Sequence, residues 1–282
     1  MSFRVITRSV RWAVCAALLA TALAGCGSHQ RSPRGLRVIT VGREYAELLT
    51  PSAGPARGTI LLFHKGGWAA EGAAAVRALR PVAERFRAWG WRALAATYRN
   101  GRAGLEDIRT TFDYAASRFG NAPICAYGES SGGYWALRLA MERPRLRCVI
   151  IAAAPTDLPA WPSEVRDPST RAYVERTLSA VFGRARATLA RESPARTWRS
   201  GTRVRLILLY AEDDPLVPPA QGIAMHHRAR GSVLLRLAAG SLPWVHSRPG
   251  RAGARDGVDA RALANDYRGI ETVLRRLAMP RH

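Results

Sequence analysis

The stretch 126–134, with the sequence AYGESSGGY, constrains the fold of this chain more than any other. An apolar run from Pro123 to Tyr127 precedes it, and apolar residues at helical spacing follow it. Gly128 and Gly132 bracket Ser130, so a sharp turn can hold the serine hydroxyl above the end of a strand. A glycine-bracketed serine alone is a weak signal, but this order of strand, turn and helix is the setting a nucleophilic serine needs. The helix N-terminus would point the Ser131 amide at a developing oxyanion.

A second stretch, His64-Lys65-Gly66-Gly67-Trp68, follows the apolar run 59–64. Such a run is typical of a strand buried on both faces of a parallel sheet. The stretch resembles the HGGGW or HGGGF loop of the α/β-hydrolase superfamily, with Lys65 in place of the first glycine. The resemblance implies that the Gly66 and Gly67 amides complete an oxyanion hole with Ser131. We interpret His64 as a histidine that braces the loop rather than as a catalytic one.

Strands and helices alternate along most of the chain, which predicts an α/β fold with a doubly wound, mostly parallel sheet. This is the α/β-hydrolase fold that the motifs imply. The expected strands cover 37–41, 45–49, 59–64, 91–97, 123–127, 146–153, 204–210 and 233–238. The expected helices cover 71–89 with a kink at Pro81, 105–119, 131–141, 169–182, 221–228 and 259–277.

The pattern changes over residues 155–202, where we expect a small helical lid insertion that overhangs the carboxyl ends of the strands. It resembles the lid of many esterases, with Phe182-Gly183 and Ser193-Pro194 as in carboxylesterase and prolyl-oligopeptidase-like relatives. Four aromatic side chains are prominent in it: Trp161, Tyr173, Phe182 and Trp198. They either line a substrate pocket or form the lid's own core, and the sequence does not decide between the two.

The candidate acid of a catalytic triad is Asp214, which follows the expected strand 204–210. In the superfamily the acid often occupies a D-x-x-V-P turn after this strand, and Val217 and Pro218 match that spacing. Asp213 is the alternative. A carboxylate here could also cap the helix that begins after Pro218.

The candidate base is His246, in the loop after the last expected strand. Relatives carry the triad histidine in such a loop, although Pro243 and Val245 are not the usual small residues there. His226 and His227 fall on the preceding helix, and we expect them to be exposed and outside the site.

Ser130, Asp214 and His246 follow the chain order serine, acid, histidine that this fold requires. The chain therefore resembles a serine hydrolase that forms an acyl-enzyme on Ser130 and needs no metal or cofactor. HKGGW together with GESSGG resembles the carboxylesterase and feruloyl-esterase-like branch, which implies a small-molecule ester as substrate. A peptidase or amidase of the prolyl-oligopeptidase type is the second hypothesis, although the β-propeller frequent in that family has no room here. A catalytically silent protein that binds a ligand or an envelope partner is the third.

The N-terminus carries the signs of export. Arg4, Arg8 and Arg11 precede an apolar run, and Leu23-Ala24-Gly25-Cys26 closes it. This resembles a bacterial lipobox, which implies a signal peptide over 1–25, a lipidated Cys26, a tether over 26–35 and a hydrolase domain over 36–282. We therefore expect a protein anchored in a membrane of the bacterial cell envelope. An ordinary signal peptide or an uncleaved anchor is the alternative.

Removing Cys15 with the signal and assigning Cys26 to lipid leaves Cys125 and Cys148, both in apolar runs. We expect two buried free thiols rather than a disulfide, which adjacent parallel strands accommodate poorly. An oxidising envelope keeps the disulfide open as an alternative.

The net charge of +22 does not predict nucleic-acid binding. The basic residues are nearly all arginines, with Lys65 as the only lysine, and they are scattered without a dense block. Dispersed arginine is compatible with anionic envelope lipids and with anionic substrates. We expect no nucleic acid among the partners.

Overall fold

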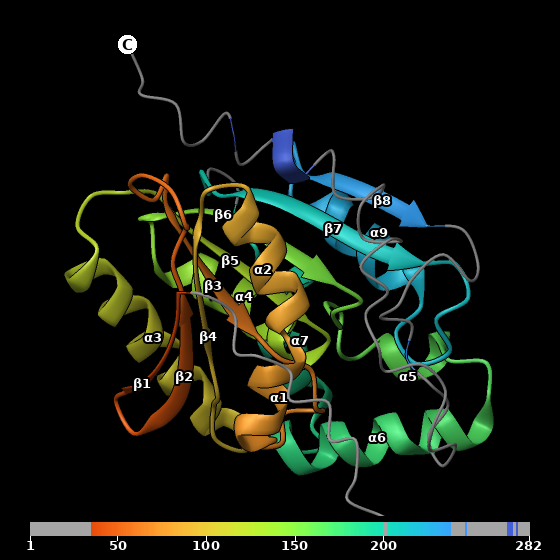
Figure 1. Ribbon diagram of the computed structural model, residues 1–282. Coiled ribbons are helices and arrows are strands. Elements are labelled where there is room, and N and C mark those ends of the chain that lie inside the picture. Colours follow the sequence, from red (N-terminus) through yellow and green to blue (C-terminus); the bar gives the residue numbers. More distant parts are fainter. Residues whose placement is uncertain (1–34, 200–201, 238–245, 247–269, 273–274, 276–282) are drawn as a thin grey trace, which may run out of the picture. The chain divides into compact units, whose positions relative to one another are not determined.

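A computed structural model of the chain describes residues 35–199, 202–237, 246, 270–272 and 275 (Figure 1). The expected signal peptide, Cys26 and most of the expected helix 259–277 lie outside these residues. All of these described residues belong to one compact unit. None of the helices in the described ranges is long and apolar enough to cross a membrane.

The centre of the molecule is a sheet of eight strands in the order β1-β2-β4-β3-β5-β6-β7-β8. β1 pairs with β2, and β2 pairs with β4, in antiparallel fashion, and all other neighbours run parallel. Every residue of β3 and β5 is buried, because helices cover both faces of the sheet at its centre. The strands are β1 (Leu36–Val41), β2 (Glu44–Leu49), β3 (Thr59–Phe63), β4 (Arg92–Ala96), β5 (Ile124–Glu129), β6 (Leu146–Ala152), β7 (Arg205–Ala211) and β8 (Val233–Leu237).

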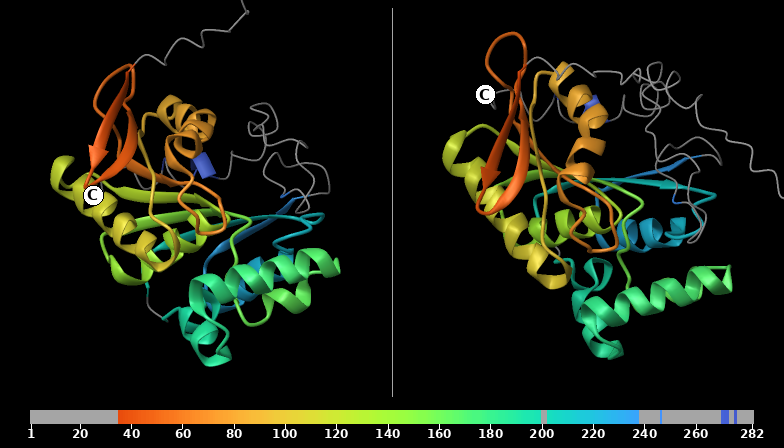
Figure 2. Two further views of the ribbon diagram at one scale, coloured as in Figure 1. Left: turned by 90° about the horizontal axis from the view of Figure 1, so that it is seen from below. Right: turned by 60° about the horizontal axis from the view of Figure 1, so that its bottom comes forward.

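The helices pack on the two faces of this sheet (Figure 2). One hydrophobic core lies between one face of the sheet and α3, α4 and the lid. A second lies between the other face and the helices α1 and α2. The doubly wound, mostly parallel sheet predicted from the sequence is confirmed. The helical elements are α1 (Gly72–Ala78), α2 (Arg80–Ala88), the 3₁₀ turn η1 (Gly101–Ala103), α3 (Gly104–Arg118), α4 (Ser131–Glu142), α5 (Trp161–Glu164), α6 (Pro168–Phe182), α7 (Arg186–Glu192), α8 (Pro194–Thr197) and α9 (Pro219–Arg228).

The predicted helix 71–89 is two helices, α1 and α2, joined at Leu79. Pro81 lies in the first turn of α2, where a missing backbone N–H leaves no hydrogen bond unmade. The expected kink is thus a break two residues before the proline.

The expectation of two free thiols is wrong, because Cys125 and Cys148 are joined by a disulfide. The two residues are direct partners in the register of β5 and β6, and their Cα atoms are 4.7 Å apart. That distance is within the range that a disulfide spans. The register shifts between Ile124 and Cys125, which brings the two cysteines opposite each other. The register between two paired strands cannot be deduced from the sequence alone.

Candidate active site

Ser130 occupies the turn between β5 and α4, at the carboxyl edge of the parallel strands. Its backbone has φ 49° and ψ −119°, a conformation that residues with a side chain rarely adopt. The Ser130 N–H donates to the Ala152 carbonyl at 2.9 Å, which ties the turn to the neighbouring strand β6. Ser130 lines a pocket although the residue as a whole is only 8% exposed. The strained turn predicted for this serine is present.

The glycines around Ser130 are required by close packing. A Cβ atom on Gly128 would lie 2.4 Å from the Gly132 carbonyl, and one on Gly132 would lie 2.3 Å from the Phe63 carbonyl oxygen. These neighbours are backbone atoms, which cannot move aside as a side chain would. The two glycines thus let α4 begin directly against β3 and β5.

Asp214 and His246 are brought together at the same edge of the sheet. Asp214 Oδ1 accepts hydrogen bonds from the Leu216 and Val217 N–H groups, both at 2.9 Å. Asp214 Oδ2 is 2.8 Å from His246 Nδ1. The helix-cap alternative for Asp214 is wrong, since Pro218 is the N-cap of α9 and no side chain caps it. One carboxylate oxygen therefore shapes the turn, and the other is left for the histidine.

This pairing fixes the tautomer of His246. Because a carboxylate only accepts, Nδ1 carries the proton, and Nε2 of the neutral ring is left as an acceptor. His246 Nε2 is buried and has no hydrogen-bond partner among the described residues. Both His246 and Ser130 line the same pocket. The arrangement can accept a proton from a hydroxyl group that enters hydrogen-bonding distance of Nε2.

The loop after β3 has positive φ at three successive residues: Gly66 at 140°, Gly67 at 62° and Trp68 at 65°. Lys65 is not among the residues with positive φ. A side chain is therefore tolerated where the superfamily commonly has its first glycine, while the two retained glycines occupy positions that disfavour one. Gly66 and Gly67 both line the pocket, close to Ser130.

His64 braces this loop, as expected. Its Nδ1 donates to the Lys65 carbonyl at 2.6 Å, and its ring stacks on Tyr98 with centroids 4.2 Å apart. Burial lowers the pKa of His64, and the bond to the Lys65 carbonyl only partly opposes this, so the ring is neutral at neutral pH. The Tyr98 hydroxyl donates to the His64 carbonyl at 2.8 Å and lies 3.1 Å from Ser131 Oγ. Tyr98 thus links the two expected halves of the oxyanion hole.

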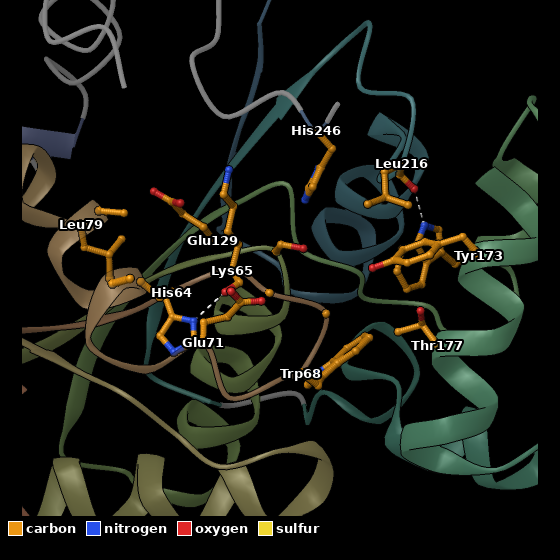
Figure 3. A pocket seen from close by; sticks show the side chains of 17 residues that line it. His64, Lys65, Trp68, Glu71, Leu79, Glu129, Tyr173, Thr177, Leu216 and His246 are labelled. Atoms are coloured by element: carbon orange, nitrogen blue, oxygen red, sulfur yellow. Dashed lines mark hydrogen bonds between the residues drawn. The ribbon is translucent and has the colours of Figure 1, made fainter. Parts of the chain in front are cut away.

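The pocket has a volume of about 560 Å³ and is walled by α1 on one side and the lid on the other (Figure 3). Glu129, which the sequence interpretation did not single out, also lines it. Burial raises the pKa of Glu129, although a hydrogen bond from the Tyr127 hydroxyl at 2.8 Å and the charges of Lys65 and His246 oppose this. The position of Glu129 directly before Ser130 in the sequence is the signal that could have identified it as a pocket residue. In the described part of the chain, no group of His, Cys, Asp and Glu side chains could hold a metal ion.

The four lid aromatics take both roles left open by the sequence. Trp161 and Tyr173 line the pocket, and Trp161 Nε1 donates to the Leu216 carbonyl at 2.6 Å. Phe182, Trp198 and also Trp161 are buried in the core that the lid shares with the sheet. Trp161 therefore belongs both to this core and to the pocket wall.

The histidines of α9 stay outside the site, as expected. His227 is exposed as expected, but the expected exposure of His226 is wrong: it is half-buried and its Nδ1 lies 2.8 Å from Ser232 Oγ. Neither lines the pocket that holds Ser130.

Comparison with known proteins gives one family. The model of the prolyl oligopeptidase family matches residues 84–237, which include Ser130 and Asp214 but neither His246 nor the loop 64–68. No curated protein sequence matches the chain.

Solved structures share the fold at low sequence identity. An esterase from the Planctomycetes species Thermogutta terrifontis is 19% identical with a TM-score of 0.61, over 86% of this chain and 93% of that one. The Pyrobaculum calidifontis esterase is 15% identical with a TM-score of 0.63, over 88% and 85%. A puromycin-hydrolyzing peptidase of Mycobacterium tuberculosis is 16% identical with a TM-score of 0.64, over 88% of this chain but only 40% of that one. At these identities the likeness shows the α/β-hydrolase fold.

Proposed function

The chain belongs to the prolyl oligopeptidase family, and from this premise we propose that it is a serine hydrolase that cleaves carboxylic esters through an acyl-enzyme on Ser130. The observation that carries the proposal is the shared pocket. Ser130 stands in a strained turn at its edge, and His246, held by Asp214 at 2.8 Å, turns an unpartnered Nε2 toward the same space.

His246 Nε2 takes the proton of the Ser130 hydroxyl as Oγ attacks the ester carbonyl carbon. The resulting imidazolium gives this proton to the alcohol oxygen as the ester bond breaks, leaving an acyl group on Oγ. Water then attacks the acyl-enzyme with His246 again acting as base, and the acid product leaves with Ser130 restored. Asp214 keeps the histidine in the required tautomer and stabilises its charged form.

The oxyanion of each tetrahedral intermediate is stabilised by the Ser131 amide and by the amide of Gly66 or Gly67. Such a donor contributes about 3 kcal/mol in hydrolases of this kind. The support lies in the loop geometry. The His64 brace and the Tyr98 bridge to Ser131 join the two segments, and the positive φ values of Gly66 and Gly67 are ones that glycine adopts readily.

Two features support esters over amides. The combination of HKGGW and GESSGG resembles the carboxylesterase branch. The pocket of about 560 Å³ between α1 and α6 has the size of a small-molecule site. The family match favours the second candidate, a serine peptidase or amidase, for which the same residues would serve.

A substrate panel on the chain that starts after Cys26 separates the candidates. Short 4-nitrophenyl esters and aminoacyl 4-nitroanilides share a chromogenic readout, and Ser130→Ala is the control. We expect ester turnover that exceeds anilide turnover and that Ser130→Ala abolishes. Preferential anilide turnover would establish the peptidase instead. No turnover of either by folded protein would favour the catalytically silent hypothesis.

A further inference from the structure

Helix α6 of the lid presents two side-chain hydroxyls to the catalytic pocket. Tyr173 and Thr177 are one helical turn apart and both line the pocket. Figure 3 shows the Tyr173 side chain reaching from α6 into the cavity, with Thr177 beside it. Within the described residues, neither hydroxyl has a hydrogen-bond partner.

The hydroxyls of the fully buried tyrosines, and of the other serine and threonine residues of α6, have hydrogen-bond partners in the protein. The four fully buried tyrosines donate to the carbonyl or carboxylate oxygens of nearby residues: Tyr98 to His64, Tyr127 to Glu129, Tyr134 to Glu192 and Tyr210 to Ala154. On α6 itself, Ser169 and Thr170 donate to Asp167, and Ser179 accepts from Arg184. The two hydroxyl residues of α6 that face the catalytic pocket are therefore the ones without a partner in the described part of this helix.

The pair also lies against the loop that we assign to the oxyanion hole. A Cβ atom on Gly67 would be 3.2 Å from the Tyr173 hydroxyl and 3.9 Å from the Thr177 methyl group. If the carbonyl oxygen of a substrate occupies that hole, the substrate atoms a few bonds away from this carbonyl would lie beside both residues. The opposite wall is mostly apolar, because α1 and the residue after it contribute Ala74, Ala75, Ala78 and Leu79, with Glu71 directly before the helix as the charged exception on this wall.

We propose that Tyr173 and Thr177 form a polar subsite that selects esters carrying an oxygen atom a few bonds from the scissile carbonyl, over plain alkyl esters. In the free enzyme, water can hydrate both hydroxyls. A bound alkyl group displaces that water and leaves the hydroxyls unpaired, whereas an ether, hydroxyl or carbonyl oxygen replaces it. Hydrogen-bonding sites reject analogues that lack the bonding group for this reason. The inference rests on the proposed function and specifies its substrate class.

Isosteric ester pairs test the proposal, because only one atom changes within each pair. 4-Nitrophenyl methoxyacetate and 4-nitrophenyl butanoate differ in the acyl half, and 2-methoxyethyl acetate and butyl acetate differ in the alcohol half. The measured quantity is the ratio of kcat/KM for the oxygenated ester to that for the alkyl ester. Intrinsic reactivity differs within a pair but is the same for every enzyme variant, so it cancels when variants are compared.

In Tyr173→Phe, and to a lesser degree in Thr177→Val, we expect this ratio to fall about fivefold or more in one of the two pairs, the size of a lost hydrogen bond. The affected pair identifies the half of the ester that lies under α6. Tyr114→Phe, which removes a tyrosine hydroxyl from α3 outside the pocket, should leave both ratios unchanged.

Ratios within twofold of wild type in both pairs, for an active Tyr173→Phe, would overturn the subsite and leave the esterase proposal intact. A merely structural effect lowers both members of a pair together and also counts against it. If folded wild-type protein hydrolyses none of the four esters, the proposed function fails and the subsite fails with it.

Discussion

Asp213 and Asp214 are adjacent acidic residues in the turn after β7, and they differ sharply in burial and in contacts. Asp214 is buried, with one oxygen fixed by the turn and the other by His246. Asp213 is exposed, in a surface hollow that Asp214, Pro215 and Arg236 also line. Burial and geometry thus distinguish two carboxylates that the D-x-x-V-P pattern alone could only rank.

Exchange of each aspartate for asparagine tests this distinction. Asp214→Asn should lower kcat for ester hydrolysis by about 10⁴-fold, because the amide holds the histidine in the wrong tautomer. Asp213→Asn is the matched control and should stay within about twofold of wild type. Similar losses in the two variants would refute the assignment. Ester turnover at saturating substrate measures both.

An ion pair between the buried Glu47 and the half-buried Arg80 joins β2 to α2. Arg80 Nε and Nη2 donate to the two carboxylate oxygens of Glu47, each at 2.7 Å, and the Tyr45 hydroxyl donates to Glu47 at 2.6 Å. Burial raises the pKa of Glu47, but the bonds from Arg80 and Tyr45 outweigh it and hold this pKa below its usual value. The stability that Glu47 contributes is therefore present above its unfolded-state pKa, and it is lost as pH falls through the lower folded-state pKa.

Replacing Arg80 should destabilise the protein at neutral pH and destabilise it less in acid. We expect Arg80→Met to lower the free energy of unfolding by about 1.5 to 3 kcal/mol at pH 7, because the buried carboxylate loses its bonds from the guanidinium and keeps only the one from the Tyr45 hydroxyl. The difference from wild type should shrink as the pH falls through the lowered folded-state pKa of Glu47, because the wild-type carboxylate then also becomes protonated. Arg87→Met, which breaks the more exposed pair with Glu84 on the same helix, should cost less than about 1 kcal/mol. Urea unfolding of the wild type and the two variants over a pH series measures these free energies. A loss of stability in Arg80→Met that does not change with pH would contradict the assigned role of Glu47.

The disulfide between β5 and β6 is tested by counting thiols. Cys125 and Cys148 are the only cysteines of the chain that starts after Cys26. Unfolded in denaturant without a reductant, it should show no free thiol, and two after reduction. Two thiols before reduction would restore the original expectation. Because the cross-link closes a loop of 23 residues, reduction should lower the free energy of unfolding by about 3 kcal/mol.

The elements that carry long apolar runs were predictable from the sequence. The strands β3, β5, β6 and β7 and the helices α3, α4 and α6 begin and end within about two residues of their predicted positions. Hydrophobic periodicity suffices for these because burial on the sheet selects the pattern directly. The residues Ser130, Asp214 and His246 could be chosen from short motifs and chain order.

Features that depend on which residues meet across the fold were not predictable. The pairing of Cys125 with Cys148 needs the register of two parallel strands, and the direction of Tyr173 needs the position of α6 over Gly67. The bridge from Tyr98 to His64 and Ser131 joins three segments that are far apart in the sequence. Periodicity assigns a residue to an inner or an outer face, but it does not name the partner on that face.

At the scale of the whole molecule, we propose that the hydrolase is held at a membrane of the bacterial cell envelope by a lipid on Cys26. The support is the sequence of the segment 1–26, in which a basic start, an apolar run and the lipobox-like LAGC follow one another. The net charge of +22 would favour a position near anionic lipids.

Metabolic labelling with a clickable palmitate tests the anchor. Cells that express the full chain should show a labelled protein, and Cys26→Ala should remove the label. Cys15→Ala, which changes a cysteine inside the expected signal peptide, should keep it. Undiminished labelling of Cys26→Ala would rule out this anchor.

The most direct test of the central claim is the mass of the folded chain after reaction with a fluorophosphonate. Attack by an activated serine displaces fluoride and leaves one phosphonyl group on the protein. We predict a single adduct that maps to Ser130, that is absent in Ser130→Ala and that persists in Ser131→Ala. A Ser130→Ala protein that still gains the adduct, or a folded wild type that does not, would contradict Ser130 as the nucleophile.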